Sequence, residues 1–464
     1  MQDNSGGFGG LPLKPSTLRT LIQLGYLEPT AVQAEGLPHA LAGKDLIAQA
    51  ETGSGKTAVF ALALLANLNQ RRFAAQSLVL CPTRELADQV AAEIRRLARG
   101  DENVKVIVLC GGVPLRNQTS SLAHGAHVVV GTPGRIMDHL ERGSLRLDAV
   151  NTLVLDEADR MLDMGFVDDM IRIAAACPAE RQTLLFSATY PEGIEKLAAR
   201  FLKNPVRISA EVRRRDDAID ERAYEVREEN RFDAVASLLT HFRPESALAF
   251  CNTRLRCRDL TEDLRRRGFS VLELQGELDQ WEREQVLARF SGRSVGVLVA
   301  TDVASRGLDI ERLEAVVNVD ISPDPEVYTH RVGRTARAGE TGLALSLFDA
   351  GELALIKRIE GYRSREIPRF DLPALPPTET PPPMPPMATL QILSGRKDKI
   401  RAGDVLGALT GDAGYAKERI GRIKISESCV YVAVERAMAE EAVRKLNEGR
   451  IKGKSVRVRL LGYS

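Results

Sequence analysis

The sequence predicts an α/β protein with two tandem doubly wound parallel-sheet domains and a smaller third domain. Along most of the chain, short apolar runs alternate with helical patterns, which is typical of doubly wound domains. A charged stretch interrupts the alternation once, and the pattern then starts again. A proline-rich segment separates this region from the last part of the chain. The length of 464 residues is sufficient for about three domains.

The first block, residues 1–208, contains short runs in which every residue is apolar, with no alternation of polar and apolar residues inside the run. Strands that helices cover on both faces bury every side chain, so their sequences are apolar throughout. We expect parallel strands at Leu46–Ala48, Leu78–Cys81, Val106–Leu109, His127–Val130, Leu153–Leu155 and Thr183–Phe186, with a helix over Ala58–Leu68.

The second block, residues 223–370, repeats this pattern after an expected linker at 209–222. The linker is highly charged between Glu211 and Glu221 and has no apolar periodicity. In the second block we expect strands at Ala247–Phe250, Val271–Leu274, Val297–Ala300, Ala315–Asn318 and Leu345–Phe348.

A second linker is expected at residues 371–387, where eight of seventeen residues are proline. Such a stretch cannot form a helix or an interior strand and serves as an extended spacer. The remaining residues, 388–464, follow the order βαββαβ of a ferredoxin-like domain. Its strands are expected at Thr389–Leu393, Ile420–Ile425, Cys429–Val434 and Val456–Leu460, and its helices at Ala402–Leu409 and Met438–Leu446.

Composition excludes several classes of protein. Apolar residues make up 44% and charged residues 27% of the chain, an ordinary globular mixture. The longest apolar run, Ala58–Ala66, is too short to span a bilayer, and the N-terminus lacks a secretory pattern. The six cysteines are too scattered for a zinc site or a disulfide framework. We therefore expect a cytoplasmic protein with reduced thiols and no membrane association.

The net charge of +1 hides an asymmetry between the tail and the rest of the chain. Residues 387–464 carry 16 basic and 9 acidic side chains, whereas residues 1–386 carry 48 basic and 54 acidic ones. A basic tail on an acidic body favours a polyanionic partner for the tail. A solvated charged surface would have the same composition.

One segment has the composition of a phosphate-binding loop. The sequence AETGSGKT, residues 50–57, follows an expected strand and opens an expected helix. Backbone N–H groups and a helix N-terminus would therefore face a phosphate chain. Lys56 would reach the β- and γ-phosphates, and the Thr57 hydroxyl would ligate Mg²⁺. The expected nucleotide-binding residues are Thr52, Gly53, Ser54, Gly55, Lys56 and Thr57. The alternative is a tight turn that binds nothing.

An acidic pair follows the strand expected at 153–155. Asp156 would hold the magnesium ion, and Glu157 would orient or deprotonate the attacking water. A lone acidic pair after a strand is usually a helix cap. Its combination with the phosphate loop favours a catalytic role for Lys56, Asp156 and Glu157.

These residues resemble the DEAD-box ATP-dependent RNA helicases. Asp156–Asp159, with the sequence DEAD, is the motif that names the family, and the family carries alanine at the position of Ala50. The resemblance covers residues 8–370. It implies two RecA-like domains, ATP and Mg²⁺ as cofactors, RNA as the partner, and local strand separation. It also implies that ATP and RNA together close the two domains before hydrolysis.

The resemblance includes the adenine-binding region. Gly25-Tyr26, Pro29-Thr30 and Gln33, with Phe8 seventeen residues before Gly25, are similar to the Q motif of the family. The Gln33 amide offers one donor and one acceptor, which match the acceptor and donor on the adenine edge. We expect Phe8 and Gln33 to contact the nucleotide.

Several loops at expected strand ends resemble the motifs with which the family grips RNA. Phosphate and sugar contacts of this kind bind without reading sequence. The resemblance also implies that Ser187, Thr189 and His330 couple hydrolysis to strand separation. The expected RNA contacts are Pro82, Thr83, Arg84, Gly112, Thr132, Gly134 and Arg135 in the first domain, and Asn252, Thr253 and Thr301 in the second.

Further positions in the second domain resemble residues that reach the nucleotide. Asp309 would bond the ATP ribose, and Arg334 and Arg337 would act as arginine fingers on the γ-phosphate. Two positions depart from the family. Gln275 stands in place of the usual histidine, and Trp281 stands where a charged residue is more common.

The tail, residues 387–461, is similar to the C-terminal RNA-binding domain of a bacterial helicase of large-subunit ribosome assembly. Basic segments at 396–399 and 447–454 carry the likeness, which implies binding of a 23S-type rRNA hairpin in a pre-ribosomal particle. Gln391 and Val434 stand where RRM-type domains carry stacking aromatics, which leaves Tyr431, so the basic loops must supply much of the affinity. The alternative for the tail is a domain that binds protein. The expected RNA contacts are Arg396, Lys397, Lys399, Lys452 and Lys454.

The sequence thus predicts an RNA-stimulated ATPase, acting as a monomer, that remodels ribosomal RNA locally. The tail would bind the RNA site and so bring the helicase core to it. An ATP-gated RNA clamp, or a general RNA remodeller without rRNA preference, would carry the same motifs. A DNA helicase is a weaker alternative, because the choice of RNA depends on contacts to the 2′-hydroxyl that a sequence does not show.

Overall fold

The computed structural model describes residues 7–50, 53–101, 103–190, 192–209, 219–305, 313–336, 341–373 and 381–462. By its contacts the chain divides into two compact units, one formed mainly by residues 1–214 and the other by residues 215–306 and 310–464. Thr52, Asp309 and Arg337, and parts of both expected linkers, lie outside the described residues.

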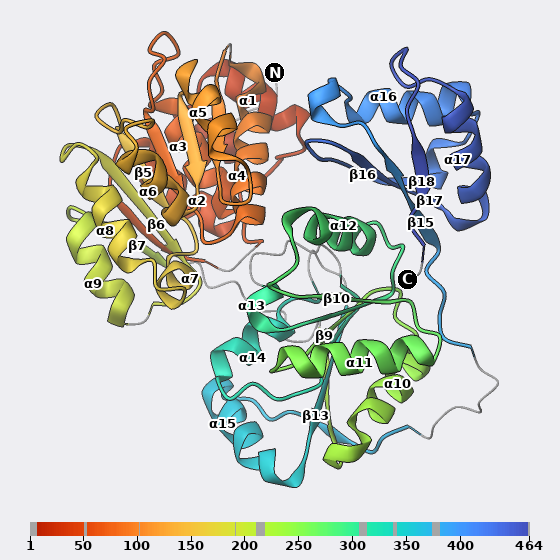
Figure 1. Ribbon diagram of the computed structural model, residues 1–464. Coiled ribbons are helices and arrows are strands. Elements are labelled where there is room, and N and C mark those ends of the chain that lie inside the picture. The colour runs from red at the N-terminus through yellow and green to blue at the C-terminus, as the bar shows by residue number, and fades with distance from the viewer. Residues whose placement is uncertain are drawn as a thin grey trace. The chain divides into compact units, whose positions relative to one another are not determined.

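The first unit contains a seven-stranded parallel sheet (Figure 1). Its strand order is β3-β4-β2-β5-β6-β1-β7, and every neighbouring pair is parallel. The strands are β1 (Leu46–Gln49), β2 (Ser77–Leu80), β3 (Val106–Leu109), β4 (Val128–Gly131), β5 (Thr152–Leu155), β6 (Gln182–Ser187) and β7 (Val206–Ser209).

Helices cover both faces of this sheet, which explains the continuous apolar runs. Neighbouring strand residues point to opposite faces, and both faces are buried. Val79 and Val154 belong to one core cluster, whereas Leu78 and Leu153 belong to the other. The helices are α1 (Pro15–Gln23), α2 (Ala31–Leu41), α3 (Lys56–Ala66), α4 (Arg84–Leu97), α5 (Leu115–Ala123), α6 (Pro133–Glu141), α7 (Ala158–Asp163), α8 (Val167–Ala175) and α9 (Glu192–Phe201).

The second unit repeats this architecture with the strand order β10-β11-β9-β12-β13-β8-β14. All neighbouring pairs in this sheet are parallel. The strands are β8 (Ile219–Glu225), β9 (Ala247–Phe250), β10 (Val271–Leu274), β11 (Val297–Ala300), β12 (Ala315–Asn318), β13 (Gly342–Phe348) and β14 (Arg369–Phe370). The helices are α10 (Arg231–Phe242), α11 (Arg254–Arg266), α12 (Gln280–Ser291), α13 (Asp302–Ser305), α14 (Pro325–Val332) and α15 (Leu353–Arg363).

Strand β8 lies partly inside the expected linker, because residues 219–222 pair with β13. Its sequence, IDERAYE, contains four charged residues and therefore lacks the apolar run that indicates a buried strand. Glu221 is nevertheless buried, since its carboxylate accepts hydrogen bonds from the Tyr328 hydroxyl at 2.8 Å and from Arg363 at 2.6 Å. A paired and hydrogen-bonded carboxylate can occupy an interior strand at low cost. The second domain therefore begins earlier than the sequence pattern indicates.

The tail is a four-stranded antiparallel sheet of order β16-β17-β15-β18 with two helices. Its elements follow the predicted order βαββαβ, so the two parallel sheets and this sheet together confirm the predicted fold class. The elements are β15 (Met387–Ile392), α16 (Ala402–Gly407), β16 (Ile420–Ile425), β17 (Val430–Glu435), α17 (Ala439–Glu448) and β18 (Val458–Leu460).

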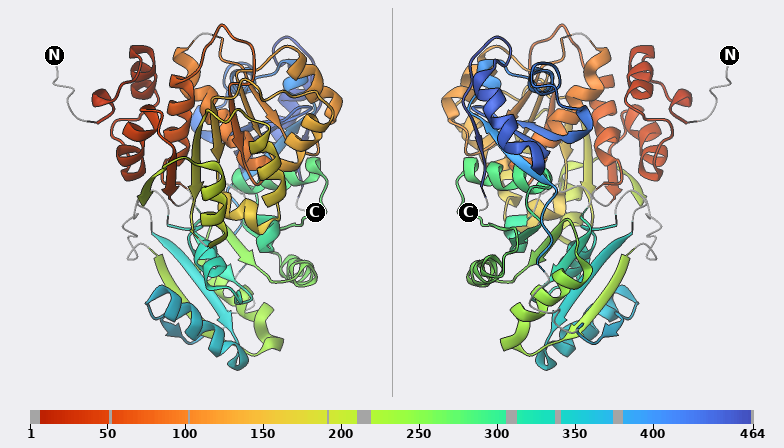
Figure 2. Two further views of the ribbon diagram at one scale, coloured as in Figure 1. Left: turned by 90° about the vertical axis from the view of Figure 1, so that its left-hand side faces the viewer. Right: turned by 90° about the vertical axis from the view of Figure 1, so that its right-hand side faces the viewer.

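Helix α12 of the second sheet packs on the tail sheet (Figures 1 and 2). Glu284 and Ala288, four residues apart and so on one helix face, contact the tail, and Gly292 at the end of the helix lies so close that a Cβ atom there would be 3.1 Å from Cβ of Ala433. Glu284 accepts a hydrogen bond from the Ser426 hydroxyl at 2.5 Å, and Ala288 packs against Tyr431. The tail is thereby fixed to the second parallel sheet.

Two further expectations can be compared with the described residues. Among them, no helix combines the length and apolar character needed to cross a bilayer. All six cysteines are buried and form no disulfide.

The packing at the end of β4 leads to a stability prediction. A Cβ atom on Gly131 would lie 2.5 Å from the Leu109 carbonyl oxygen, whereas one on Gly134 would have no heavy atom within 4 Å. Gly131→Ala should therefore lower stability by about 1–3 kcal/mol through backbone displacement. Gly134→Ala, on helix α6, should leave stability unchanged or raise it. Calorimetry of the full chain measures the affected transition. Equal midpoints for both variants would contradict the packing argument.

Candidate functional site

The phosphate loop connects β1 to α3 and depends on two glycines. Gly53 and Gly55 have φ angles of +87° and +92°, a region that other residues rarely adopt. A Cβ atom on Gly55 would also lie 2.5 Å from Nε2 of Gln33. Lys56 is the first residue of α3, and Thr57 follows it. The loop thus directs the start of α3 toward the carboxyl edge of the sheet.

A buried charge cluster lies beside this loop. Nζ of Lys56 is 3.2 Å from Oδ1 of Asp156 and 3.8 Å from Oε1 of Glu157. Burial alone would lower the pKa of Lys56, but the carboxylates of Asp156, Glu157 and Asp159 raise it, so the lysine stays protonated. Arg160 pairs with Glu157 at 2.7 Å. Three carboxylates against two cations leave an excess of negative charge.

Asp156 is a member of the cluster whose carboxylate oxygens both lack hydrogen-bond partners among the described residues. It is fully buried, and burial raises its pKa while Lys56 opposes the shift. Apart from the ion pair with Lys56, neither carboxylate oxygen has a hydrogen-bond partner among the described residues. No group of three or more metal-ligating side chains occurs in the described part of the chain. Mg²⁺ usually needs only one or two carboxylates beside phosphate and water, so the donor set suits it.

Asp159 connects this cluster to the end of β6. Its Oδ2 accepts hydrogen bonds from the N–H groups of Ala188 and Thr189, both at 3.0 Å, and from the Thr189 hydroxyl at 3.1 Å. The Ser187 hydroxyl accepts from the Asp159 N–H at 3.3 Å. The structure therefore brings Ser187 and Thr189 to the acidic motif. Sequence reasoning gave no role to Asp159, although its place in the same motif was a signal.

The side chain of Gln33 lies on the phosphate loop. Its oxygen accepts from the Thr30 N–H and its nitrogen donates to the Gly55 carbonyl, both at 3.0 Å. The Thr30 hydroxyl donates to the Ser54 carbonyl at 2.8 Å. Phe8 is buried, with its ring edge-to-face on Tyr26 at 6.2 Å. Each end of the Gln33 amide makes one bond to protein, which leaves its second N–H and its second oxygen lone pair for adenine.

The expected RNA contacts of the first unit lie at the ends of three neighbouring strands. Pro82 and Thr83 follow β2, and the Thr83 hydroxyl caps α4 by accepting from the Leu86 N–H at 3.3 Å. The guanidinium of Arg84 lies over the glycine turn after β3, where a Cβ on Gly112 would be 1.8 Å from Nη1. The φ angle of +74° at Gly112 explains why glycine occupies that turn.

Thr132 and Gly134 follow β4 at the start of α6, and Arg135 holds the neighbouring loop. The Arg135 guanidinium donates to the Val113 carbonyl at 2.8 Å and to the Gln118 side-chain oxygen at 2.9 Å. Gln118 also donates to the Cys110 carbonyl at 2.8 Å. Gln118 was not predicted, because nothing in the sequence distinguishes this buried glutamine from other residues of a polar helix.

Asn252, expected to contact RNA, is held by protein on every polar group of its side chain. Its Oδ1 accepts from Arg331 at 2.9 Å, and its Nδ2 donates to the Ile321 carbonyl at 3.0 Å. Its backbone N–H donates to Asp320 at 2.8 Å. Arg331 in turn pairs with Asp302 at 2.7 Å. Asn252 therefore positions its loop through both its side chain and its backbone N–H.

The other expected residues of the second unit lie near the same edge. The Thr253 hydroxyl accepts from the Arg256 N–H at 3.2 Å, and the Thr301 hydroxyl accepts from the Ala304 N–H at 3.4 Å. His330 lies in the last turn of α14, and Arg334 is buried in the turn that follows.

The tail brings its two basic segments together. The Lys452 amine donates to the Lys399 carbonyl at 2.6 Å, and the Lys454 amine donates to the Asp398 carbonyl at 3.1 Å. Lys399 and Lys452 have left-handed φ angles of +62° and +54°, a strain that often marks functional loops. We call Arg396, Lys397, Lys399, Lys452 and Lys454 the basic cluster.

The tail sheet itself offers no stacking surface. Tyr431 is 1% exposed because Ala288 of α12 covers it, and Gln391 is also buried. Val434 was expected on the stacking face, but it belongs to the core beneath the tail helices. The reason is the alternation of β17, which turns Val430, Val432 and Val434 inward. Without an exposed aromatic of this kind on the described strands, the basic loops are the candidate binding elements of the tail.

Family models match most of the chain. Residues 30–197 match a model described as DEAD/DEAH box helicase, and residues 230–339 match the helicase conserved C-terminal domain. Residues 389–460 match the DbpA RNA binding domain. The chain belongs to the DEAD-box ATP-dependent RNA helicases, and its additional RNA-binding domain makes it a helicase of the DbpA type.

Individual relatives agree with this assignment. The ATP-dependent RNA helicase DbpA of Escherichia coli is 50% identical over 97% of this chain and 98% of its own length. The DEAD-box ATP-dependent RNA helicase CshA of Bacillus cereus is 43% identical over 79% of this chain and 70% of its own. A solved structure of S. cerevisiae Dbp5 bound to RNA and ADP BeF3 is 30% identical, with a TM-score of 0.72 over 79% of this chain and 96% of that one.

The hydrogen bonds of Arg331 lead to a prediction about RNA binding. Arg331→Lys keeps the charge but loses the fork that holds Asn252 and Asp302 together. The dissociation constant for single-stranded RNA should rise about tenfold, the cost of one or two charge-assisted hydrogen bonds. Binding of an ATP analogue should not change. Fluorescence titrations measure both quantities, with Arg266→Lys at an exposed position as control. Unchanged RNA affinity would show that the hydrogen bonds of Arg331 to Asn252 and Asp302 do not contribute to RNA binding.

Proposed function

We propose that this helicase remodels short structured segments of large-subunit ribosomal RNA during ribosome assembly, with the tail holding a 23S-type rRNA hairpin. The observation that carries the proposal is the convergence of the two basic segments in the basic cluster. Five cations on exposed loops suit an RNA backbone. The likeness of the tail to the DbpA RNA binding domain supports the same assignment.

In the proposed mechanism, the phosphate loop binds the triphosphate and α3 presents its N-terminus to it. Thr57 and Asp156 would hold Mg²⁺, which neutralises phosphate charge when bound. Lys56 would then turn from Asp156 toward the β- and γ-phosphates. Glu157 would orient the attacking water and accept its proton, since its buried position beside Arg160 keeps it in a fixed orientation.

The second unit would complete the reaction. By resemblance to the family, Asp309 would bond the ribose, and Arg334 and Arg337 would stabilise the charge on the transferred phosphoryl group. Ser187, Thr189 and His330 would couple ATP hydrolysis to movement of the RNA-contacting loops. The bond network of Asp159 to the end of β6 supports a role for Ser187 and Thr189 in this coupling.

The proposal places the protein in the cytoplasm as a monomer that acts on a pre-ribosomal particle. An ATP-gated clamp, which closes on RNA without separating strands, is the alternative. The two differ in the number of duplexes released for each ATP consumed.

The proposal predicts a preference among RNA activators of ATP hydrolysis. A fragment of large-subunit rRNA should stimulate hydrolysis by the full chain much more strongly than an equal mass of unstructured RNA. Reversing charge in the basic cluster, with Arg396→Glu and Lys397→Glu together, should raise the rRNA concentration for half-maximal stimulation at least about tenfold. Stimulation by unstructured RNA should persist, because the core surfaces remain.

Lys417→Glu together with Arg422→Glu, which reverses two exposed cations of the tail outside the basic cluster, is the matched control. Equal stimulation by both RNAs in the unaltered chain would overturn the rRNA assignment and leave a general RNA remodeller. A loss of both activities in the cluster variant would show that the charge change had damaged the core.

A further inference from the structure

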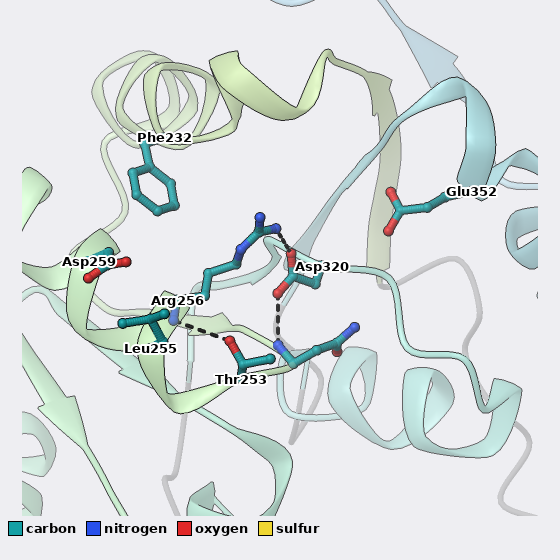
Figure 3. A pocket seen from close by; sticks show the side chains of 8 residues that line it. Phe232, Thr253, Leu255, Arg256, Asp259, Asp320 and Glu352 are labelled. Carbon is teal, nitrogen blue, oxygen red and sulfur yellow. Dashed lines mark hydrogen bonds and ion pairs between the residues drawn. The ribbon is translucent and has the colours of Figure 1, made fainter.

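Helix α12 begins next to two groups of residues that are expected to contact RNA. One group lies at the carboxyl edge of the second parallel sheet, where Asn252 and Thr253 line a pocket of about 470 Å³ (Figure 3) and Thr301 follows β11. The other group is the basic cluster of the tail. The second residue of α12 is Trp281, which is 42% exposed and stands where the family more often carries a charged residue. The proposed mechanism does not use it.

The first turn of α12 is bonded to the loop after β11. The Arg283 guanidinium donates to the Ala304 carbonyl at 2.9 Å, and the Ala304 N–H donates to the Thr301 hydroxyl at 3.4 Å. Thr301 is one of the expected RNA contacts. Trp281 precedes Arg283 by two residues, so it lies within one helical turn of a side chain that reaches this loop.

The same end of α12 is bonded to the tail. Glu284 follows Trp281 by three residues and is its neighbour on the helix surface. The Glu284 carboxylate accepts from the Ser426 hydroxyl at 2.5 Å, and the Ser426 carbonyl accepts from the Arg396 N–H at 3.0 Å. Arg396 belongs to the basic cluster. The turn of the tail that contacts α12 therefore also supports the basic cluster.

The direction of α12 places Trp281 at the end of the tail sheet that bears the basic cluster. The helix follows β17 toward the turn before that strand, as its successive contacts show: Gly292 with Ala433, Ala288 with Tyr431, and Glu284 with Ser426. Trp281 comes next, about 5 Å further along the helix axis. An exposed indole thus lies where the two RNA-contacting groups approach each other.

The acidic side chains at this end of α12 are engaged by the protein. The Asp279 carboxylate accepts from the Glu282 N–H at 2.8 Å, and the Glu282 carboxylate accepts from the Asp279 N–H at 3.1 Å. Glu277 forms an ion pair with Arg254. Because these groups give the site no excess of positive charge, Trp281 would bind RNA through the face of its indole, and the phosphates would bind the basic cluster.

We propose that Trp281 stacks on a base of the single-stranded RNA that leads from the tail to the loops of the second parallel sheet. An aromatic face stacks on every base, so it adds affinity without reading sequence. The position between two RNA-contacting groups favours a base over a protein side chain. The proposal deepens the proposed function by naming a further RNA-binding residue, and it rests on that function for the RNA contacts of the basic cluster.

The test uses the full chain, a saturating non-hydrolysable ATP analogue and a 20-nucleotide oligoadenylate. Trp281 is the only tryptophan of the chain, so intrinsic tryptophan fluorescence reports on this position alone. A stacked base quenches indole emission, and we therefore expect saturable quenching as the unlabelled RNA binds. In a separate anisotropy titration with labelled RNA, Trp281→Ala should raise the dissociation constant at least about fivefold, the effect of losing one stacked base.

Two further variants separate stacking from a structural effect. Trp281→Phe keeps an aromatic ring and should stay within about twofold of the unaltered chain. Tyr362→Ala removes an exposed aromatic side chain from α15 of the same unit and should also leave the affinity within about twofold.

Each of three results would overturn the inference. One is unchanged tryptophan emission when the oligoadenylate is fully bound, and another is equal affinity of Trp281→Ala and the unaltered chain. The third is equal weakening by Trp281→Ala and Tyr362→Ala, which would indicate a general effect of losing a surface aromatic. The rRNA preference in ATP hydrolysis is measured separately. Its failure would overturn the proposed function and leave the quenching by oligoadenylate unaffected.

Discussion

The buried contact between Lys56 and Asp156 is the interaction on which the catalytic unit depends. Two opposite charges without water are stable only as a pair, and removal of one partner from such a pair costs about 3–5 kcal/mol. The pair joins the phosphate loop after β1 to the acidic motif after β5, and Asp159 extends it to the end of β6. Nucleotide, metal and coupling residues are thereby held by one charge cluster. In the proposed mechanism, the unpartnered oxygens of Asp156 would hold the magnesium ion that accompanies the triphosphate.

A second constraint is the rigidity of the parallel sheets, which place short loops at fixed positions. Arg84 and Arg135 each hold a neighbouring loop through close contacts and hydrogen bonds. In the second unit, Arg331 does the same for the loops after β9 and β11. Arg84 and Arg135, which the family resemblance associates with RNA, thus also hold the loops around them in place. The packing of the tail on α12 likewise leaves its loops, not its sheet, for binding.

Much of this architecture could be predicted because it depends on local patterns. Short apolar runs predicted eleven strands of the two parallel sheets, and the phosphate loop and acidic motif were found by their own residues. Strand β8 was missed because its buried charge, Glu221, is compensated by Tyr328 and Arg363 from distant parts of the chain. The roles of Asp320 and Gln118 were not predicted for the same reason. Each bonds several groups that are distant in the sequence and that only folding brings together. The position of Val434 was wrong because strand alternation, not the domain type, decides which face a residue occupies.

The role of Asp156 can be tested most directly by measuring how Mg²⁺ affects binding of a fluorescent ATP analogue. In the unaltered chain, Mg²⁺ should tighten binding strongly. Asp156→Asn should remove most of that effect, because an amide offers no charge to the ion. Asp159→Asn should retain it, because Oδ2 of Asp159 already accepts hydrogen bonds from Ala188 and Thr189 and Oδ1 accepts one from the Arg160 N–H. Equal magnesium dependence in the Asp156→Asn variant and the unaltered chain would contradict the account.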